Sequence, residues 1–578
     1  MRLGMAQINS TVGNLSGNTE KIMHYIDKAR ELGVDLLTFP ELAITGYPPE
    51  GLVLKPQFIK RNQKCLEEIV SHTADIAVIV GFIDSNSSLY NAAALMHNNY
   101  LDGIYHKVHL PDYDIFDETS YFQAGTEYPV FVLYGIGVGI TISNDMWYEF
   151  GPATVQAHSG AELLINISAT PCHVGKRRLR ERMLATRASD NVVIVAHNNL
   201  VGGQDEVVFD GNSLIINEKG EIIARGKQFE EDLVVADLDL ESLSRSRWHG
   251  LRRQKEAYWI KKELEQANRI EVPSKYPRGI KSPLPPRQVR ELDELGEIYQ
   301  ALVLGTRDYV LKNGFEKVVI GLSGGIDSSL TATIAVDALG ANNVIGVSMP
   351  SRYSPPESKT DSEALAKNLA IDLKVIPIEK AFKAYLSMLE ELFQGTEVNE
   401  AEENIQARIR GNILMALSNK FRWLVLACSN KSEVATGYTT LYGDMAGGFS
   451  PLKDVPKTMV IDLVKYKNRQ AGKEVVPSSV INKAPSAELK ADQKDTDALP
   501  PYKLLDLILK AYLEDNVPVD QIIAMGFSPE MVVKAIRLVD KSEYKRRQSP
   551  PGIKITTTDI RKEKKLPITN QFQEHLIQ

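Results

Sequence analysis

The chain has 578 residues, which is too long for one hydrophobic core, so we expect two large domains. Hydrophobic residues make up 43% and charged residues 24%, as in globular proteins, and the net charge of -7 argues against a nucleic-acid partner. Three cysteines exclude a disulfide framework, no apolar run reaches the roughly 20 residues that cross a bilayer, and MRLGMAQINS is unlike a signal peptide; we expect a cytoplasmic protein without a membrane partner.

Predicted strands alternate with helices over the first 170 residues or so, and the first helix is expected at 18–32. Beyond that point the strands are short and joined by turns such as Asn217-Glu-Lys-Gly. The expected strands run over residues 3–9, 34–39, 76–83, 91–96, 192–196, 213–216 and 222–225. This pattern predicts an α/β sandwich over residues 1–260.

Three polar residues follow strand ends in this half. Glu41 lies in FPELAITGYPP, Lys107 in KVHLPDYDIFDE, and Ser143 in the segment GVGITISNDMW. A residue of these types at a strand end is, taken alone, more often a solvated side chain than a catalytic group.

Together and in this order, the three segments resemble the nitrilase-like glutamine amidases, over roughly residues 1–260. The resemblance implies that Glu41 is the general base and that Lys107 stabilises the tetrahedral oxyanion. It also implies that Tyr113 and Glu118 bind glutamine and support the lysine.

Ser143 stands where that family has its nucleophilic cysteine, and Asn144 stands where an acidic residue is common. Cys65, Cys172 and Cys428 lie in other segments. A thiol has a pKa near 8.5 and readily forms a thiolate, whereas a hydroxyl is far less acidic. We therefore expect glutamine to bind and to be hydrolysed very slowly. An engineered exchange that traps glutamine and a natural loss would both leave this pattern.

The stretch from 242 to 287 is charged and then rich in proline, which predicts a linker over 261–289 with a short helix at 255–268. A nucleic-acid patch is the weaker interpretation of its basic residues. A helix is expected to resume at 290–313 and to begin a second domain, residues 290–578.

The segment that organises the second domain is VVIGLSGGIDSSL, residues 318–330. A short apolar run predicts a buried strand, SGG breaks it, and a helix is expected over 330–339. This geometry directs backbone N–H groups and a helix N-terminus at an anion. A Walker loop would end in Gly-Lys-Ser, but this one ends in Asp327-Ser, and a carboxylate beside phosphates suits Mg²⁺.

Further strands are expected at 344–350, 375–378 and 423–428, which predicts a doubly wound parallel sheet with ligands at the strand C-termini. Glu433 follows the last of these and could complete a Mg²⁺ site with Asp327. A loop over 475–497 could close over the reaction.

The phosphate loop resembles that of ATP pyrophosphatases, which implies an adenine nucleotide alpha hydrolase-like fold. SGGIDSS, EENIQARIRG, NKSEVATGYTTLYGDMAGG, PSAEL and EYKRRQ together resemble NAD synthetases over residues 290–560. With the amidase half, the whole chain resembles glutamine-dependent NAD synthetases, which are homo-oligomers.

This resemblance implies that ATP adenylates deamido-NAD, and that ammonia from glutamine then displaces AMP to give NAD. The implied ATP contacts are Ser323, Gly324, Gly325, Ile326, Asp327, Ser328, Ser329, Cys428, Lys457 and Ser486. The implied deamido-NAD contacts are Asn404, Arg408, Glu433 and Lys545, and Asp327 with Glu433 would bind Mg²⁺. Cys428 stands where the family usually has threonine.

Four alternatives stay open at this point. One is another amidotransferase with the same loop, such as an enzyme that makes GMP, which would lack the later motifs. The second is a non-catalytic nitrilase-like scaffold fused to a nucleotide-binding module. The third is a nucleic-acid thiolation enzyme, which would need catalytic cysteines and a basic face. The last is an ammonia-only NAD synthetase with a degenerate amidase domain.

Overall fold

The computed structural model describes residues 1–86, 88–112, 116–248, 267–274, 281–490, 493–560 and 564–572. The chain divides into two compact units: residues 1–204 with 208–292, and residues 205–207 with 293–578. Most of the helix expected at 255–268 lies outside the described residues.

The first unit contains a six-stranded sheet in the order β14-β1-β2-β3-β4-β5. Its central strands β1, β2 and β3 are parallel, whereas β14, β4 and β5 pair antiparallel with their neighbours. The strands are β1 (Arg2–Gln7), β2 (Leu36–Thr38), β3 (Ala77–Asp84), β4 (Tyr90–His97), β5 (Tyr100–His106) and β14 (Asp232–Asp237).

A second sheet of seven strands has the order β13-β12-β9-β8-β7-β6-β15. The strands are β6 (Val130–Leu133), β7 (Ile136–Ile142), β8 (Leu163–Ser168), β9 (Ile194–Asn199), β12 (Leu214–Ile216), β13 (Ile222–Arg225) and β15 (Arg269–Glu271). A separate ribbon pairs β10 (Val201–Gln204) with β11 (Val207–Asp210).

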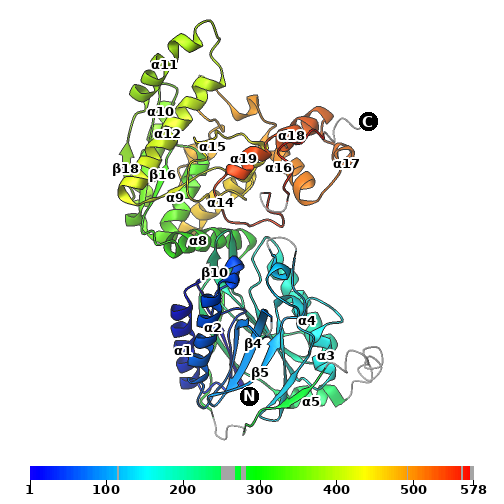
Figure 1. Cartoon of the computed structure of the whole chain (residues 1–578). Helices are drawn as coiled ribbons and strands as arrows, with labels where there is room; N and C mark the ends of the chain where they lie inside the picture. The colour runs from blue at the N-terminus through cyan, green and yellow to red at the C-terminus, as the bar shows by residue number, and fades with distance from the viewer. Residues whose placement is uncertain are drawn as a thin grey trace. The chain divides into compact units, whose positions relative to one another are not determined.

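The two sheets pack face to face, since Leu3 and Ile79 of the first share one buried cluster with Ile140 and Ile165 of the second. Helices cover the outer faces, with α1 (Leu15–Glu31) and α2 (Pro56–Val70) on the first sheet. The second sheet is covered by α3 (Pro152–His158) and α4 (Lys176–Asn191), as Figure 1 shows. The predicted α/β sandwich is confirmed. Helix α5 (Leu240–Trp248) follows β14.

The second unit is built on a four-stranded parallel sheet in the order β18-β17-β16-β19. The strands are β16 (Val318–Gly321), β17 (Val344–Ser348), β18 (Asp372–Val375) and β19 (Leu424–Leu426). The helices between them are α9 (Ile326–Leu339), α10 (Pro356–Leu369), α11 (Glu379–Phe393) and α12 (Glu400–Phe421), and α8 (Glu294–Lys312) precedes the sheet (Figure 1). The predicted doubly wound sheet is confirmed.

Two boundaries in this sheet differ from the sequence-based expectation. β18 ends at Val375, where a strand was expected to begin, because this edge strand is largely exposed and its apolar residues come after it. Helix α9 begins at Ile326 rather than at Leu330, with Gly325 as its N-cap. The Ile-Asp-Ser-Ser part of the loop therefore forms the first helical turn, and this places Asp327 at the helix N-terminus.

A helical part completes the second unit around a core that includes Val434, Ile508, Ile522 and Ile536. Its elements are α13 (Lys431–Thr436), α14 (Lys457–Ala471), α15 (Ser478–Asn482), α16 (Tyr502–Leu509), a π-helical turn (Lys510–Glu514), α17 (Val519–Ala524), α18 (Pro529–Lys541) and α19 (Glu543–Gln548). Among the described residues, no helix combines the length and apolarity that crossing a lipid bilayer requires.

Candidate active sites

A buried ion cluster forms the first site, in the amidase-like unit. Glu41 follows β2, Lys107 follows β5, and Glu118 begins the 3-10 turn η2 (Glu118–Ser120). The Lys107 ammonium donates to Glu41 Oε1 at 2.7 Å and to Glu118 Oε1 at 2.8 Å, and the lysine side chain is 1% exposed. The sheet therefore brings together three of the residues singled out in the sequence.

Neighbouring donors hold both carboxylates in place. The Tyr47 hydroxyl donates to Glu118, and Glu41 accepts from Asn91 Nδ2 at 2.8 Å and from the Ala169 N–H at 2.9 Å. Burial raises the pKa of Glu118 in spite of the neighbouring lysine. Burial also opposes the charge on Lys107, but the two glutamates outweigh it and raise the pKa of this lysine. The cluster thus places an acid–base group beside a fixed cation.

Ser143 follows β7 and begins the turn η3 (Ser143–Met146), in a left-handed backbone conformation with φ of 43°. The Ser168 hydroxyl donates to Ser143 Oγ at 3.5 Å, and the next residue, Ala169, donates to Glu41. Two consecutive residues thus contact Ser143 and Glu41, which places the hydroxyl and the carboxylate in one site. A non-glycine residue with positive φ is uncommon and clusters at functional turns.

Asp145 connects the Ser143 turn to the segment after Lys107. Its buried carboxylate accepts backbone N–H groups of Ile142, Val108 and His109 at 3.0, 3.2 and 2.8 Å, and the hydroxyl of Tyr105 at 2.8 Å. Asp145 was not among the residues singled out from the sequence, where the available signal was an acidic residue in the polar turn that follows an apolar strand. Tyr113 lies outside the described residues, and Cys65 is buried in α2.

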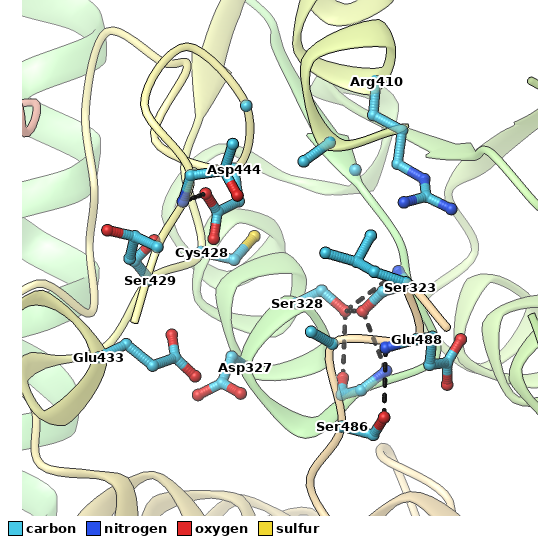
Figure 2. Close-up of a pocket in the computed structure, with 18 of the residues that line it drawn as sticks. Ser323, Asp327, Ser328, Arg410, Cys428, Ser429, Glu433, Asp444, Ser486 and Glu488 are labelled. Atoms are coloured by element: carbon cyan, nitrogen blue, oxygen red, sulfur yellow. Dashed lines mark hydrogen bonds between the residues drawn. The ribbon is translucent and has the colours of Figure 1, made fainter. Parts of the chain in front are cut away.

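The phosphate loop forms the second site, between β16 and α9. Ser328 donates to the Gly325 carbonyl at 3.0 Å, and the Gly325 N–H donates to Ser323 Oγ at 3.2 Å (Figure 2). Ser329 donates to the same carbonyl at 2.8 Å. Gly324 has φ of 77°, and a Cβ there would lie 2.4 Å from the Ser358 carbonyl oxygen. Only glycine fits at that position, so the loop packs directly on the next helix.

Two carboxylates meet next to this loop. Asp327 lies in the first turn of α9 and Glu433 in the first turn of α13, and Figure 2 shows their carboxylates facing one another. Lys457 is ion-paired with Asp327, and its Nζ lies 3.6 Å from Glu433 Oε1. Burial and the charge of Asp327 raise the pKa of Glu433 to about 8. The structure thus gathers Asp327, Glu433 and Lys457 at one place.

The donor set suits Mg²⁺. Among the described residues, no group of three or more His, Cys, Asp or Glu side chains could hold a metal ion, so these two acids stand as a pair. Magnesium takes one or two protein carboxylates and completes its octahedron with phosphate oxygens and water. A carboxylate pair beside a phosphate loop fits that preference.

The loop and the acids line a pocket of about 710 Å³. The same pocket is lined by Cys428, Ser486, Asn404 and Lys545. Burial raises the pKa of the Cys428 thiol to about 12, which keeps the thiol neutral. Lys545 donates to the carbonyls of Gly437 and Thr439, both at 2.7 Å.

Arg408 departs from the arrangement expected from the sequence. Asn404 and Arg408 were expected to share one helical face, but only Asn404 lines the large pocket. Arg408 is exposed, donates to the Leu441 carbonyl at 3.3 Å, and lines a second pocket of about 560 Å³ with Tyr442. The arginine of this motif that lines the large pocket is Arg410, which was not among the site residues expected from the sequence.

Comparisons with known proteins cover both units. Residues 2–247 match the family model of carbon-nitrogen hydrolases, and residues 298–549 match that of NAD synthases. The chain is 46% identical to a glutamine-dependent NAD(+) synthetase of Thermotoga maritima over all of both chains. It is 47% identical to one of Aquifex aeolicus, over 99% of this chain and 100% of that one.

A solved structure supports the same conclusion. The glutamine-dependent NAD(+) synthetase from Acinetobacter baumannii, in complex with ADP, is 37% identical, with a TM-score of 0.74 and 98% of each chain covered. Full-length identity well above 30%, with both family models matched in order, establishes the relationship. The chain belongs to the glutamine-dependent NAD(+) synthetase family.

Proposed function

We propose that this protein makes NAD from deamido-NAD, using ATP and an amide nitrogen, with AMP and diphosphate as the other products. The observation that carries the proposal is the meeting of the phosphate loop with Asp327 and Glu433 in one pocket. The full-length similarity to synthetases of this specificity supports the choice of substrates. A GMP-forming amidotransferase or a thiolation enzyme lacks that support.

The first step joins deamido-NAD to ATP. The nicotinate carboxylate attacks the α-phosphorus of ATP, a P–O bond forms, and the bond to diphosphate breaks. The loop at Ser323–Ser329 holds the leaving diphosphate with backbone N–H groups, hydroxyls and the α9 N-terminus. Positioning and charge neutralisation carry a step of this kind, so no nucleophilic side chain is needed.

The second step is attack of ammonia on the adenylated carboxyl carbon. The C–N bond forms, the bond to AMP breaks, and the nitrogen loses a proton to give the carboxamide. Lys457, Ser486 and Cys428 are proposed contacts of ATP. Asn404, Arg408 and Lys545 are proposed contacts of deamido-NAD, with Arg408 approaching from the second pocket.

Asp327 and Glu433 would hold Mg²⁺, which neutralises phosphate charge when it is bound. Burial favours the neutral form of Glu433, whereas the neighbouring ammonium of Lys457 and a bound cation would both favour its carboxylate form.

In the amidase-like unit, we propose that glutamine binds beside Glu41, Lys107 and Ser143, with Tyr113 and Glu118 as further contacts. Glu41 is the proposed base and Lys107 the proposed oxyanion partner. Hydrolysis is slow because a hydroxyl replaces the thiol. An ammonia-only synthetase with a degenerate amidase unit is the alternative, and it differs in predicting that no glutamine binds.

The experiment that tests the function supplies deamido-NAD, ATP, Mg²⁺ and ammonium without glutamine, and detects NAD and AMP by mass spectrometry. We expect both products in equal amounts. Absence of NAD would favour the non-catalytic scaffold. Glutamine in place of ammonium should give little NAD, and isothermal calorimetry with glutamine then separates a slow amidase from a degenerate one.

A homo-oligomer is also proposed. Helix α11 exposes Tyr385, Met388 and Leu392 at 41, 68 and 76%, an unusual apolar series for a solvated helix face. Light scattering on the eluting peak should give a mass of at least twice 64.3 kDa. A mass near one chain at micromolar concentration would contradict this proposal.

A further inference from the structure

One nitrogen of the Arg410 guanidinium is hydrogen-bonded to the protein backbone, and the two terminal NH₂ groups face the pocket. It lies on α12, and its Nε donates to the carbonyl of Met349 at 3.0 Å, just beyond the end of β17. Among the described residues, its two terminal NH₂ groups have no hydrogen-bond or ion-pair partner. Figure 2 shows the guanidinium pointing into the pocket, on the side of Ser323.

A charged group in this position favours an anionic ligand. The guanidinium stays protonated in proteins, although burial lowers the pKa of Arg410 and the charge of Glu488 only partly offsets this. A partly buried charge without acceptors is destabilising, whereas a ligand oxyanion would satisfy the free NH₂ groups with two parallel hydrogen bonds. The two terminal NH₂ groups of Arg410 are thus placed to bind an anion in the pocket.

The surroundings indicate which anion this is. Figure 2 places Arg410 on the same side of the pocket as Ser323 and Ser328, away from Asp327 and Glu433. β16 and β17 are adjacent parallel strands, so the Met349 carbonyl that fixes Arg410 lies at the sheet edge where the phosphate loop begins. The guanidinium therefore faces the loop.

A carboxylate of the protein already lies at this end of the pocket. Glu488 accepts from Ser358 Oγ at 2.5 Å and from Lys483 Nζ at 2.9 Å. Ser358 is also the residue against which Gly324 packs. Cationic and hydroxyl groups thus stabilise negative charge next to the loop.

We propose that Arg410, whose guanidinium faces the phosphate loop from α12, binds the β- and γ-phosphate oxygens of ATP and then the diphosphate product. The proposal rests on the function proposed above. It adds to the loop a side chain that recognises the phosphates by a planar fork, which a lysine cannot reproduce. The reacting α-phosphate would lie nearer to Asp327 and Glu433, where Arg410 does not point.

Direct binding of inorganic diphosphate tests this without turnover. Calorimetry at a fixed Mg²⁺ concentration compares the full-length protein with Arg410→Gln and Arg410→Lys. We expect Arg410→Gln to weaken diphosphate binding by about tenfold to a hundredfold, the range for charge-assisted hydrogen bonds, and Arg410→Lys to fall between. AMP lacks the outer phosphates, so its affinity for Arg410→Gln should be within about twofold of its affinity for the unchanged protein.

Lys420→Gln is the matched control, since Lys420 is an exposed cation near the end of the same helix. It should leave diphosphate affinity unchanged. Thermal unfolding checks that the variants fold. If Arg410→Gln does not fold, the diphosphate affinity of Arg410→Lys tests the proposal instead.

Unchanged diphosphate affinity in Arg410→Gln would overturn the proposal. Equal losses for AMP and diphosphate would place the guanidinium on the nucleoside or α-phosphate instead and would also overturn it. A raised KM for deamido-NAD with normal diphosphate binding would assign Arg410 to the nicotinate carboxylate. Failure of the unchanged protein to make NAD, with diphosphate binding still dependent on Arg410, would count against the proposed function alone.

Discussion

The two polar sites of this chain each place two carboxylates around one lysine, but they differ in the groups that surround these charges. In the amidase-like unit, Lys107 donates to both Glu41 and Glu118, and neighbouring N–H and O–H groups hold both carboxylates. In the synthetase-like unit, Asp327 and Glu433 share one lysine, and Arg410 keeps its terminal NH₂ groups for the pocket.

The difference follows from what each site must stabilise. An amidase site works on a neutral amide and has to keep its own charges in place before substrate arrives. A nucleotide site receives several negative charges together with a metal, so some of its charged side chains can be paired by the ligand instead of by other protein groups. Substitutions of charged or polar residues are therefore expected to have different effects in the two sites.

The largest effect is expected from Asp327→Asn, which breaks the carboxylate pair. Ammonium-dependent NAD formation should fall by about a thousandfold, because the metal loses a charged ligand where phosphate charge is neutralised. Initial rates at saturating ATP measure this. Asp372→Asn, on the exposed strand β18, is the control and should stay within about twofold. A small loss in Asp327→Asn would remove the reason for contrasting the two sites.

Ser143→Cys tests the same comparison in the amidase-like unit. With the rest of the ion cluster intact, a thiol should raise glutamine hydrolysis by about a hundredfold or more, because thiolate is the stronger nucleophile at neutral pH. Ammonia release from glutamine measures it. Ser143→Ala should show no gain, and Glu41→Gln added to Ser143→Cys should remove it. A thiol without effect would show that the Ser143 assignment is wrong.

Asp145→Asn tests whether the amidase-like site depends on its own hydrogen bonds. The amide NH₂ would replace one of the two oxygens and would face either the Ile142 N–H or the N–H groups of Val108 and His109, so we expect a loss of about 2 kcal/mol in the free energy of unfolding. Urea denaturation followed by Trp fluorescence measures this. Tyr105→Phe, which removes only the hydroxyl donor to Asp145, is the milder comparison. Equal stability of Asp145→Asn and the unchanged chain would contradict this account.

The smallest effect concerns Asp102 on β5, a carboxylate outside either site. Burial raises its pKa to about 6, and one of its oxygens has no hydrogen-bond partner among the described residues. Since the folded form holds the proton more tightly, stability should fall as pH rises from about 4 to about 6.

Asp102→Asn should remove that fall and raise the free energy of unfolding at pH 7 by about 1 kcal/mol, after allowance for partial solvent screening. Denaturation at pH 4.5 and pH 7 compares the two chains. A pH profile that is the same in both would show that Asp102 ionises as readily in the folded chain as in the unfolded one.

Much of the architecture could be predicted from the residues alone. Alternating strand and helix patterns predicted both fold classes, and glycine with serine after a buried strand predicted the phosphate loop. Helix α9 started earlier than expected because the loop residues themselves supply its first turn. Edge strand β18 was misplaced because its exposed side carries no apolar signal.

The sequence alone determined most of the helices and strands, the order of the motifs and the presence of serine at position 143, because these features depend on short segments of the chain. Only the tertiary structure decided which side chains meet. The Asp327–Glu433 pair depends on strand order, and the contacts of Asp145 depend on two loops coming together. Arg408 and Arg410 point in different directions because residues two positions apart do not share a face of a helix, but which of the two lines the large pocket depends on how α12 is rotated against its sheet. Packing sets that rotation, and no spacing within the motif encodes it.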